Sequence, residues 1–331
     1  MGIKGYLKHL IQENPSNKER KYDYVYIDCN YMLHYLIYNC KNDFDLYTKT
    51  YDYMKYLFET IIIKQKIFLI FDGSYPANLQ NSNPKLQTII KRGKYKKESN
   101  DYDKQRIAPK TNIIKTFKEN LIDIINKNKK LHKATFCIEI NDDYIDDEAD
   151  YKILNSIYDN SYDNICIISK DSDMILIAYS LAYSKQICID ILSNLRPIQF
   201  ININLINKGY NMDYVLIVLL MGNDYLPKLS NIDYETLFFN YDQYIQHQNL
   251  PIIINNLVNY NNFINFITYI IVNKKIKMNI KKLDIDRFNN YYNNILWCLK
   301  KYLVIANNYD YIEDNNKVIN IYNFINSSDY K

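Results

Sequence analysis

One segment, Asn164–Met174 with the sequence NICIISKDSDM, constrains the fold of this chain more than any other. Four consecutive apolar residues, 165–168, are typical of a strand that is buried on both faces. Asp171 and Asp173 follow this run and precede an apolar, helix-like segment, 174–182. In open α/β sheets, ligands bind in the crevice outside the carboxyl ends of the strands. The pair of carboxylates is therefore expected at a ligand-binding edge, and a solvated turn that caps the helix is the alternative interpretation.

Two other predicted strands end in the same way. The segment Asp23–Asp28 contains apolar residues and ends in an acid, and the apolar segment Lys66–Phe71 is followed by Asp72. Parallel strands that are joined by helices bring their carboxyl ends to one edge of a sheet. The repeated order of apolar strand and then acid predicts an α/β fold with a central, mostly parallel sheet flanked by helices.

The spacing of apolar residues predicts the other elements. We expect helices over 50–63 and 111–128 and strands over 134–140 and 184–192. From about residue 234 onward the chain is rich in Asn but keeps helical apolar spacing, and no linker precedes it. We therefore expect a core over residues 1–230 and a helical extension over residues 231–331 that packs on this core.

Three further acids lie at positions where the backbone direction is well defined. Glu148 and Asp150 precede an apolar helical pattern, so both are expected at a helix start, where acids also suit the helix dipole. Asp224 lies in a turn that is bracketed by Gly222 and Pro227. Together with the acids at the strand ends, these residues form one candidate group.

Converging carboxylates repel one another strongly unless a cation neutralises them. Oxygen ligands of this kind favour Mg²⁺ or Mn²⁺, and two such ions about 3.5–4 Å apart form a phosphodiesterase site. The predicted ligands are Asp28, Asp72, Glu148, Asp150, Asp171, Asp173 and Asp224. Lys170 would add positive charge at the scissile phosphate, or else form a surface ion pair. The sequence thus predicts a hydrolase with two metal ions.

A basic segment, 85–110, follows the acid of the second strand. It contains nine Lys and Arg residues against three acids. Such runs are often solvated loops, but beside a metal site they also suit the binding of a polyanion.

The composition fits a cytoplasmic protein. The chain has no run of about 18 apolar residues that would span a membrane, and its start, MGIKGYLKHL, has no signal-peptide core. Six scattered cysteines without a CxxC pair are expected to be reduced thiols. We expect a cytoplasmic monomer that does not associate with membranes.

In combination, these motifs resemble the Xrn-type 5′→3′ exoribonucleases, within the wider superfamily of PIN-like and flap-type 5′ nucleases. The resemblance rests on MGIKGYLKHL, YVYIDCNYMLH, FDG, DEADYKI, SKDSDMI and VLLMGNDYLP, in this order, and more weakly on YYNNILWCLKKYL around Trp297. It covers about the first 230 residues and implies a PIN-like core in a shortened member of the family.

The resemblance also implies roles for particular residues. The seven acids would hold two Mg²⁺ or Mn²⁺ ions, and the substrate would be single-stranded RNA with a 5′-monophosphate, which links the chain to mRNA degradation. His34 matches the family histidine that stacks on the 5′-terminal base, whereas a lone helical histidine is otherwise a packed residue. Candidates for binding the 5′-phosphate and the second base face are Lys85, Gln87, Lys91, Arg92, Tyr309 and Tyr311. The tyrosines depart from the family pattern, which has a tryptophan there.

Two other classes of function are alternatives to a 5′→3′ exoribonuclease. A flap-type DNA nuclease follows its last aspartate with a Gly-rich hairpin that grips duplex DNA, but the sequence after Asp224, YLPKLSNIDYETLFF, contains no glycine. A non-catalytic RNA-binding scaffold would not require every acid position to be filled. Whether DNA is degraded as well stays open, because no residue can be assigned to a 2′-hydroxyl contact.

Overall fold

The computed structural model describes residues 10, 20–38, 40–73, 111–141, 148–195, 198–206, 211–223, 226, 228–229, 232–255, 257–273, 285–303 and 318–319. The chain divides into two compact units at residues 206/207. None of the described helices is both long enough and apolar enough to cross a membrane.

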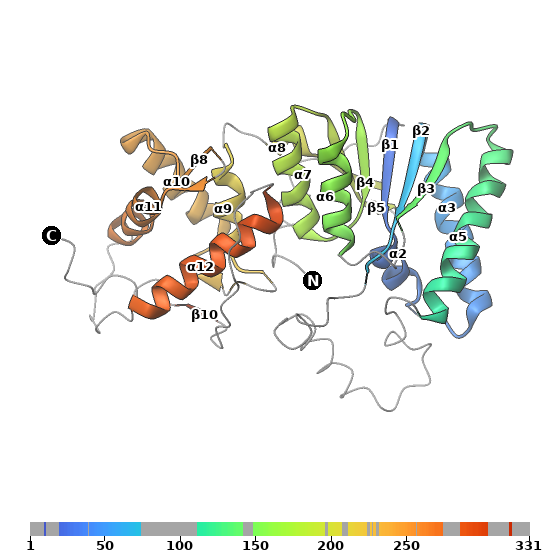
Figure 1. Ribbon diagram of the computed structural model, residues 1–331, viewed down its shortest axis with the longest axis horizontal. Coiled ribbons are helices and arrows are strands. Elements are labelled where there is room, and N and C mark those ends of the chain that lie inside the picture. Colours follow the sequence, from blue (N-terminus) through green and yellow to red (C-terminus); the bar gives the residue numbers. More distant parts are fainter. Residues whose placement is uncertain are drawn as a thin grey trace. The chain divides into compact units, whose positions relative to one another are not determined.

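The first unit is built around a six-stranded sheet with the order β3-β2-β1-β4-β5-β6. The strands are β1 (Arg20–Asp28), β2 (Ile61–Ile70), β3 (Cys137–Asn141), β4 (Ile165–Ile168), β5 (Ile189–Leu195) and β6 (Ile198–Asn202). Neighbours from β3 to β5 pair in parallel, and β6 pairs antiparallel to β5. The predicted fold class, a mostly parallel sheet flanked by helices, is confirmed (Figure 1).

Helices connect these strands and cover the sheet. They are α2 (Cys29–Leu36), α3 (Asp43–Thr60), α5 (Asn112–Leu131), α6 (Ala149–Asp159), α7 (Ser172–Lys185) and α8 (Ile203–Ile206). Side chains of β1 alternate between the two faces of the sheet. Val25 and Ile27 belong to the core with α2, α3 and α5, whereas the Tyr26 hydroxyl lies 3.0 Å from Ser156 Oγ on α6. The helices therefore form a layer on each face.

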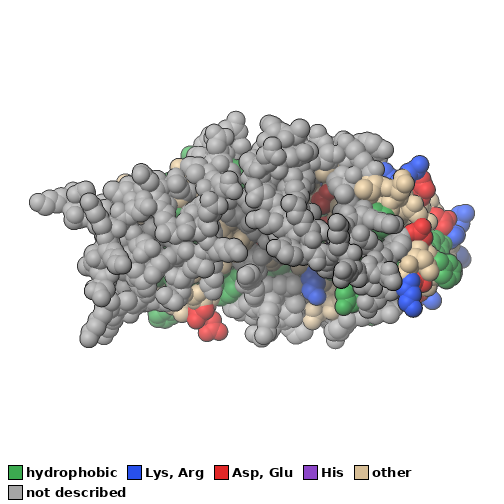
Figure 2. Space-filling model, turned by 90° about the horizontal axis from the view of Figure 1, so that it is seen from below, with side chains coloured by type: hydrophobic (Ala, Val, Ile, Leu, Met, Phe, Trp, Pro, Cys, Tyr) green, Lys and Arg blue, Asp and Glu red, His purple; other side chains and the backbone are tan. Residues whose placement is uncertain are grey.

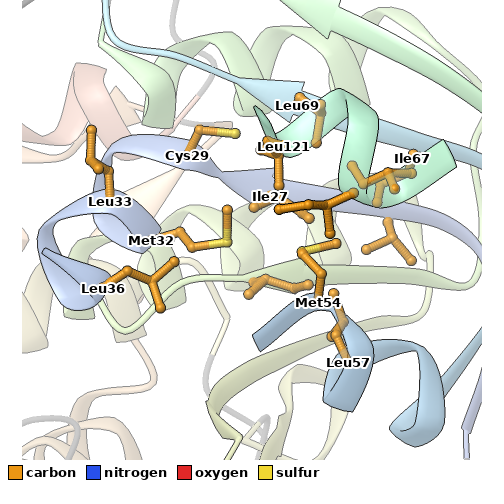
Figure 3. Close-up of a cluster of buried hydrophobic side chains, with 14 of the residues drawn as sticks. Ile27, Cys29, Met32, Leu33, Leu36, Met54, Leu57, Ile67, Leu69 and Leu121 are labelled. Atoms are coloured by element: carbon orange, nitrogen blue, oxygen red, sulfur yellow. The ribbon is translucent and has the colours of Figure 1, made fainter. Parts of the chain in front are cut away.

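The core on the α3 and α5 face packs against the β1–α2 connection. Figure 3 shows Met32 of α2 and Met54 of α3 beside Ile27, Ile67 and Leu69 of the sheet, and each of these side chains is fully buried. Side chains buried this completely contribute about 1.5–3 kcal/mol each. The first turns of α2 are thereby fixed against the end of β1.

Two predicted boundaries were wrong for local reasons. The helix predicted over 50–63 begins at Asp43 because the side chain of Asn42 caps it, accepting a 2.9 Å hydrogen bond from Asp45 N. The helix ends at Thr60, and 61–63 pair with β1 as part of β2. Residues 61–63 are three isoleucines, and β-branched residues suit a strand better than a helix.

The strand predicted over 184–192 was also misplaced at its start. Helix α7 continues to Lys185, and Gln186 ends it in the left-handed conformation, with φ of 56°. The strand β5 then begins at Ile189. Helices often end in a residue with left-handed backbone conformation, which is usually glycine or asparagine. Glutamine is uncommon there, so the sequence did not indicate that the helix ends at this position.

The second unit is mainly helical in its described part, as predicted for the C-terminal region. Its helices are α9 (Asp213–Leu219), α10 (Tyr234–Gln248), α11 (Tyr260–Asn273) and α12 (Ile285–Tyr302). Two short pairs of strands accompany them: β7 (Lys228–Leu229) with β10 (Val318–Ile319), and β8 (Ile253–Ile254) with β9 (Leu257–Val258). Helix α9 packs with the later helices of this unit.

A buried carboxylate joins three elements of this second unit. Asp213 accepts hydrogen bonds from the Tyr241 hydroxyl at 2.6 Å and from the backbone N–H groups of Ile252 at 2.8 Å and Ile253 at 2.5 Å. Burial raises the pKa of this carboxyl group above its ordinary value. The three donors satisfy a group that would otherwise be costly to bury.

Candidate functional site

The carboxyl ends of three neighbouring strands lie at the same level of the sheet. Asp28 at the end of β1 is aligned with Ile70 of β2, and Ile27 is aligned with Ile168 of β4. Asp72 follows β2 by two residues, and Asp171 follows β4 by three. The predicted strand–acid pattern therefore delivers acids to one edge of the sheet, next to the first turn of α2 (Figure 1).

A short chain of hydrogen bonds links the ends of β1 and β4. Asp28 caps α2, with Oδ1 accepting from Tyr31 N at 2.9 Å, and its Oδ2 accepts from Ser169 Oγ at 3.3 Å. The same Ser169 oxygen accepts from Asp171 N at 3.1 Å. Asp171 in turn caps α7 by accepting from Asp173 N at 3.1 Å. Two strand ends and two helix starts are thus fixed through one serine.

Asp72 is held from two sides. Asn30 donates to Asp72 Oδ2 at 2.8 Å and accepts from Asp72 N at 3.2 Å, while Ala149 N at the start of α6 donates to Asp72 Oδ1 at 2.8 Å. The buried Lys152 of α6 donates its Nζ to Phe71 O at 2.7 Å. The end of β2 is therefore clamped between α2 and α6, and the carboxylate has a fixed orientation.

The electrostatics of Asp28 show that these carboxylates interact. Burial is the largest cause that raises the pKa of Asp28, to about 7, and the negative charges of Asp72 and then Asp171 add to it. Tyr31 N and Ser169 act in the opposite direction by hydrogen bonding to the carboxylate. A buried acid whose charged form is opposed by neighbouring acids is stabilised by a cation.

The donor chemistry at this edge fits a hard divalent cation, because carboxylate oxygens are the ligands that Mg²⁺ and Mn²⁺ prefer. Glu148 occupies the N-cap position of α6 without a capping side-chain hydrogen bond, and Asp150 and Asp173 lie in the first turns of α6 and α7. Asp224 lies outside the described residues. Within the described part of the chain, no three His, Cys, Asp or Glu side chains form a group that could hold a metal ion. The seven-ligand assignment accordingly stays a prediction.

The other predicted site residues are only partly described. Lys170 is exposed between β4 and α7, and His34 is exposed on α2, whose first residue follows Asp28. The remaining RNA-binding candidates lie outside the described residues: Lys85, Gln87, Lys91, Arg92, Tyr309 and Tyr311.

The described surface over α3, α5 and the neighbouring strands carries both signs of charge (right-hand end of Figure 2). Lys127 pairs with Asp123 at 2.6 Å and Lys66 with Glu139 at 2.7 Å. Exposed pairs of this kind contribute about 0–1 kcal/mol each. A surface of mixed sign does not attract a polyanion as a basic one does.

Three residues that hold the site were not predicted: Asn30, Ser169 and Lys152. All three are buried, the most exposed of them at only 7%. Asn30 stands two positions after Asp28, and Ser169 directly follows the buried strand, so their closeness to predicted ligands was a usable signal. For Lys152 the usable signal was different: it lies beside Ile153 and Leu154 on a buried part of its helix.

We expect Lys152→Met to lower the free energy of unfolding by about 1–3 kcal/mol, because Phe71 O loses a buried donor. The end of β2 should then be less well fixed, so the predicted nuclease activity should fall as well. Urea denaturation and an activity assay check both effects. Lys127→Met is the matched control, since its ion pair is exposed, and it should change stability by less than about 1 kcal/mol. Equal stability of the two variants would contradict a role for Lys152 in the clamp.

Part of the chain matches a known protein family. Residues 77–192 match the family model described as the XRN 5′-3′ exonuclease N-terminus. Over this segment, the chain is similar to the XRN family. The segment includes the starts of α6 and α7 with four of the predicted ligands, so the predicted resemblance is confirmed there, and the match supports a 5′-3′ nuclease. No curated protein matches the chain.

Solved structures give a more distant likeness. The catalytic core of Rad2 in complex with a DNA substrate is 14% identical, with a TM-score of 0.47 over 93% of this chain and 87% of that one. A bacteriophage T5 flap endonuclease in complex with DNA and metal ions is 11% identical, with a TM-score of 0.42 over 86% and 89%. T5 5′-exonuclease with bound zinc is 12% identical, with a TM-score of 0.39 over 85% and 92%. At these values, we draw nothing about function from them.

Proposed function

We propose that this chain is a metal-dependent 5′→3′ exoribonuclease that degrades 5′-monophosphorylated single-stranded RNA to mononucleotides. The observation that carries the proposal is the buried Asp28 carboxylate, opposed by Asp72 and Asp171 at the carboxyl edge of a parallel sheet. The XRN match over residues 77–192 gives independent support for the direction of attack.

The chain's own residues would prepare the site before the substrate arrives. Asn30 and Ala149 N orient the Asp72 carboxylate, and Ser169 joins Asp28 to the Asp171 backbone. The proposed ligands of two Mg²⁺ or Mn²⁺ ions are Asp28, Asp72, Glu148, Asp150, Asp171, Asp173 and Asp224. When bound, such ions supply an activated water and stabilise the leaving oxygen. The exposed Lys170 would add positive charge near the scissile phosphate.

Substrate binding would use aromatic side chains and a group of polar and basic side chains. His34 on α2 would stack on the 5′-terminal base, with Tyr309 or Tyr311 on its other face, since aromatic rings stack on bases of any sequence. Positive charges and an amide donor would recognise the terminal phosphate: the candidates are the cations Lys85, Lys91 and Arg92 and the amide of Gln87. A pocket of this kind restricts attack to one 5′ end.

The organisation of the chain belongs to the same proposal. Residues 1–230 would supply the nuclease core with its seven acids, and residues 231–331 a helical extension. The protein would act as a monomer in the cytoplasm, in mRNA degradation, without a membrane partner.

The test compares one single-stranded RNA that bears a 5′-monophosphate, a 5′-triphosphate or a 5′-hydroxyl, with matched DNA, in the presence of Mg²⁺. We expect rapid loss of the monophosphate RNA and release of mononucleotides from its 5′ end, because only that end presents the terminal group the pocket would recognise. Gel analysis of RNA labelled at its 3′ end measures the order of release.

Other results of this assay would indicate other classes of protein. Cutting at a DNA flap junction, or indifference to the 5′ group, would indicate a flap-type nuclease. A folded sample that binds RNA in Mg²⁺ or Mn²⁺ but cleaves neither substrate would indicate a scaffold. Loss of activity in EDTA that returns on addition of Mg²⁺ would support the metal requirement.

A further inference from the structure

The outer face of α2 carries a row of aromatic side chains that begins beside Asp28. His34 and Tyr35 follow Tyr31 by three and four residues, the spacing that places side chains on one face of a helix, and Tyr38 follows two residues after α2 ends. Tyr35 is 51% exposed and Tyr38 is 60% exposed. Tyrosines this exposed bury little apolar surface within the first unit, so core packing does not explain them.

The ring of Tyr35 is exposed on one side and supported on the other. It stacks on the Tyr31 ring, with centroids 6.5 Å apart and an angle of 29° between the planes. The Tyr53 ring of α3 approaches it edge-on at 6.1 Å and 61°. Aromatic contacts at these distances are favourable, so the ring is held in one orientation before anything binds. A preorganised ring loses little conformational freedom on binding.

The position of this ring relative to the carboxylates sets what it can reach. Tyr35 is seven residues from Asp28, or about 10 Å along the helix at 1.5 Å per residue. That distance equals about three stacked nucleotides at roughly 3.4 Å each. Tyr31 connects the two positions, because its N–H donates to Asp28 while its ring contacts Tyr35. A strand that has its 5′ end at the carboxylates and runs along α2 would therefore bring one of its first three bases to Tyr35.

We propose that Tyr35 is a base-stacking residue that holds one of the first three nucleotides of the substrate strand on α2. This inference rests on the proposed function and adds to it a second stacking position beside His34. The occupant is a nucleobase because the aromatic surface is continuous with the carboxylate edge where the phosphodiester would be cut. Stacking is independent of base identity, as degradation of RNA of any sequence requires.

The chain offers a closely matched control in Tyr183 of α7. Its ring is 43% exposed and stacks on Tyr179, four residues earlier, with centroids 6.4 Å apart. The pair thus repeats the geometry of Tyr31 and Tyr35. Tyr183 lies near the C-terminal end of a helix that Asp171 caps, so it is separated from the carboxylate edge by most of the length of α7. Replacing it should leave RNA binding unchanged.

The experiment couples a protein substitution to the removal of one base. The probe is a short 5′-monophosphorylated RNA with purines at its 5′ end, together with versions that lack the base at the first, second or third nucleotide. Binding is measured by fluorescence anisotropy in Ca²⁺, with RNA integrity checked on a gel. Wild type is compared with Tyr35→Ala, Tyr35→Phe, Tyr35→Leu and Tyr183→Ala, and thermal melting verifies that each is folded.

We expect Tyr35→Ala and Tyr35→Leu to weaken binding of the complete RNA by at least about fivefold. The loss should vanish with the one probe that lacks the stacked base, since neither change then removes a contact. Tyr35→Phe should bind like wild type because the ring is kept. Leucine distinguishes stacking from packing, because it retains apolar bulk without a π face.

Three results would overturn the inference while leaving the proposed function intact. The first is a Tyr35→Ala protein whose affinity falls equally for every probe, and the second is a Tyr35→Ala protein that binds RNA as tightly as wild type. The third is a loss of affinity in Tyr183→Ala as large as in Tyr35→Ala. In all three cases, wild type must still degrade RNA from its 5′ end. A surface for a protein partner would produce the second of these results. If wild type neither binds nor degrades the RNA, the proposed function itself has failed.

Discussion

Asp28→Asn is expected to abolish metal-dependent cleavage and, at the same time, to make the metal-free protein more stable above neutral pH. The activity should fall by more than about 100-fold, because losing even an outer partner of a metal ligand typically costs 10–100-fold. Asparagine is almost as good a helix cap as aspartate, so Tyr31 N keeps an acceptor and α2 keeps its start. The Ser169 hydroxyl can accept from the new amide in place of donating to the carboxylate.

The sign of the stability effect follows from the raised pKa. Asp28 has a pKa of about 7 in the folded protein against an ordinary value of 3.8, so the folded state binds the proton more tightly than the unfolded state does. Stability therefore falls as the pH rises from about 4 through about 7, and the full penalty is present above pH 7. Removing this titration should stabilise the metal-free protein by up to about 4 kcal/mol at pH 8 and by almost nothing at pH 4.

Thermal melting in EDTA and then in Mg²⁺, at both pH values, measures these effects. Mg²⁺ should raise the Tm of wild type at pH 8 but not that of Asp28→Asn. Asp233→Asn is the matched control, since Asp233 is an exposed cap that accepts from Thr236 N at 2.8 Å and should change neither activity nor the pH dependence. An Asp28→Asn protein that is less stable than wild type at pH 8 without metal would show that the carboxylate is not under repulsion.

The sequence was sufficient to predict where the acids would arrive but not what would hold them. Asp28, Asp72 and Asp171 each follow an apolar run, and runs of this kind predict parallel strands whose ends are level. The observed register agrees with that expectation. The pattern is local, since each strand and the acid after it are neighbours in the chain, and this is why it could be read directly.

The contacts that orient these acids are not local. Asn30 and Asp72 are 42 residues apart, and Asp72 and Ala149 are 77 apart. Nothing in the composition of either segment specifies which polar groups will pair across the sheet, because the pairing depends on the order of β1 and β2 in the folded sheet. Likewise, lysine is usually a surface residue, and Lys152 is buried only because α6 packs over the end of β2.

Exchanging the two partners in the double variant Asn30→Asp with Asp72→Asn is expected to restore stability without restoring activity. In Asp72→Asn alone, the new amide has one oxygen for two donors, so its NH2 group meets either the Asn30 amide or Ala149 N. Rotating Asn30 would only place its amide against the backbone N–H of position 72. In Asn30→Asp alone, two carboxylates face each other. Each single variant should lose about 1–3 kcal/mol, because a buried or half-buried polar group is left without a partner.

The exchanged pair can re-form every one of these bonds. The new carboxylate at position 30 would accept from the backbone N–H of position 72 and from the new side-chain amide there. The oxygen of that amide would accept from Ala149 N in place of the original carboxylate. The double variant should therefore unfold within about 1 kcal/mol of wild type, with a favourable coupling energy between the two changes. The negative charge, however, has moved from position 72 to position 30.

Urea denaturation of the four proteins measures the coupling, and RNA cleavage in Mg²⁺ measures what the position of the charge contributes. If Asp72 binds a metal ion, both proteins that carry the Asp72→Asn change should lose more than about 100-fold in rate, however stable they are. Recovery of cleavage in the exchanged variant would show instead that Asp72 only joins β2 to α2 and α6. Because stability and charge position change separately in this set, a loss of rate in the stable double variant cannot be attributed to unfolding.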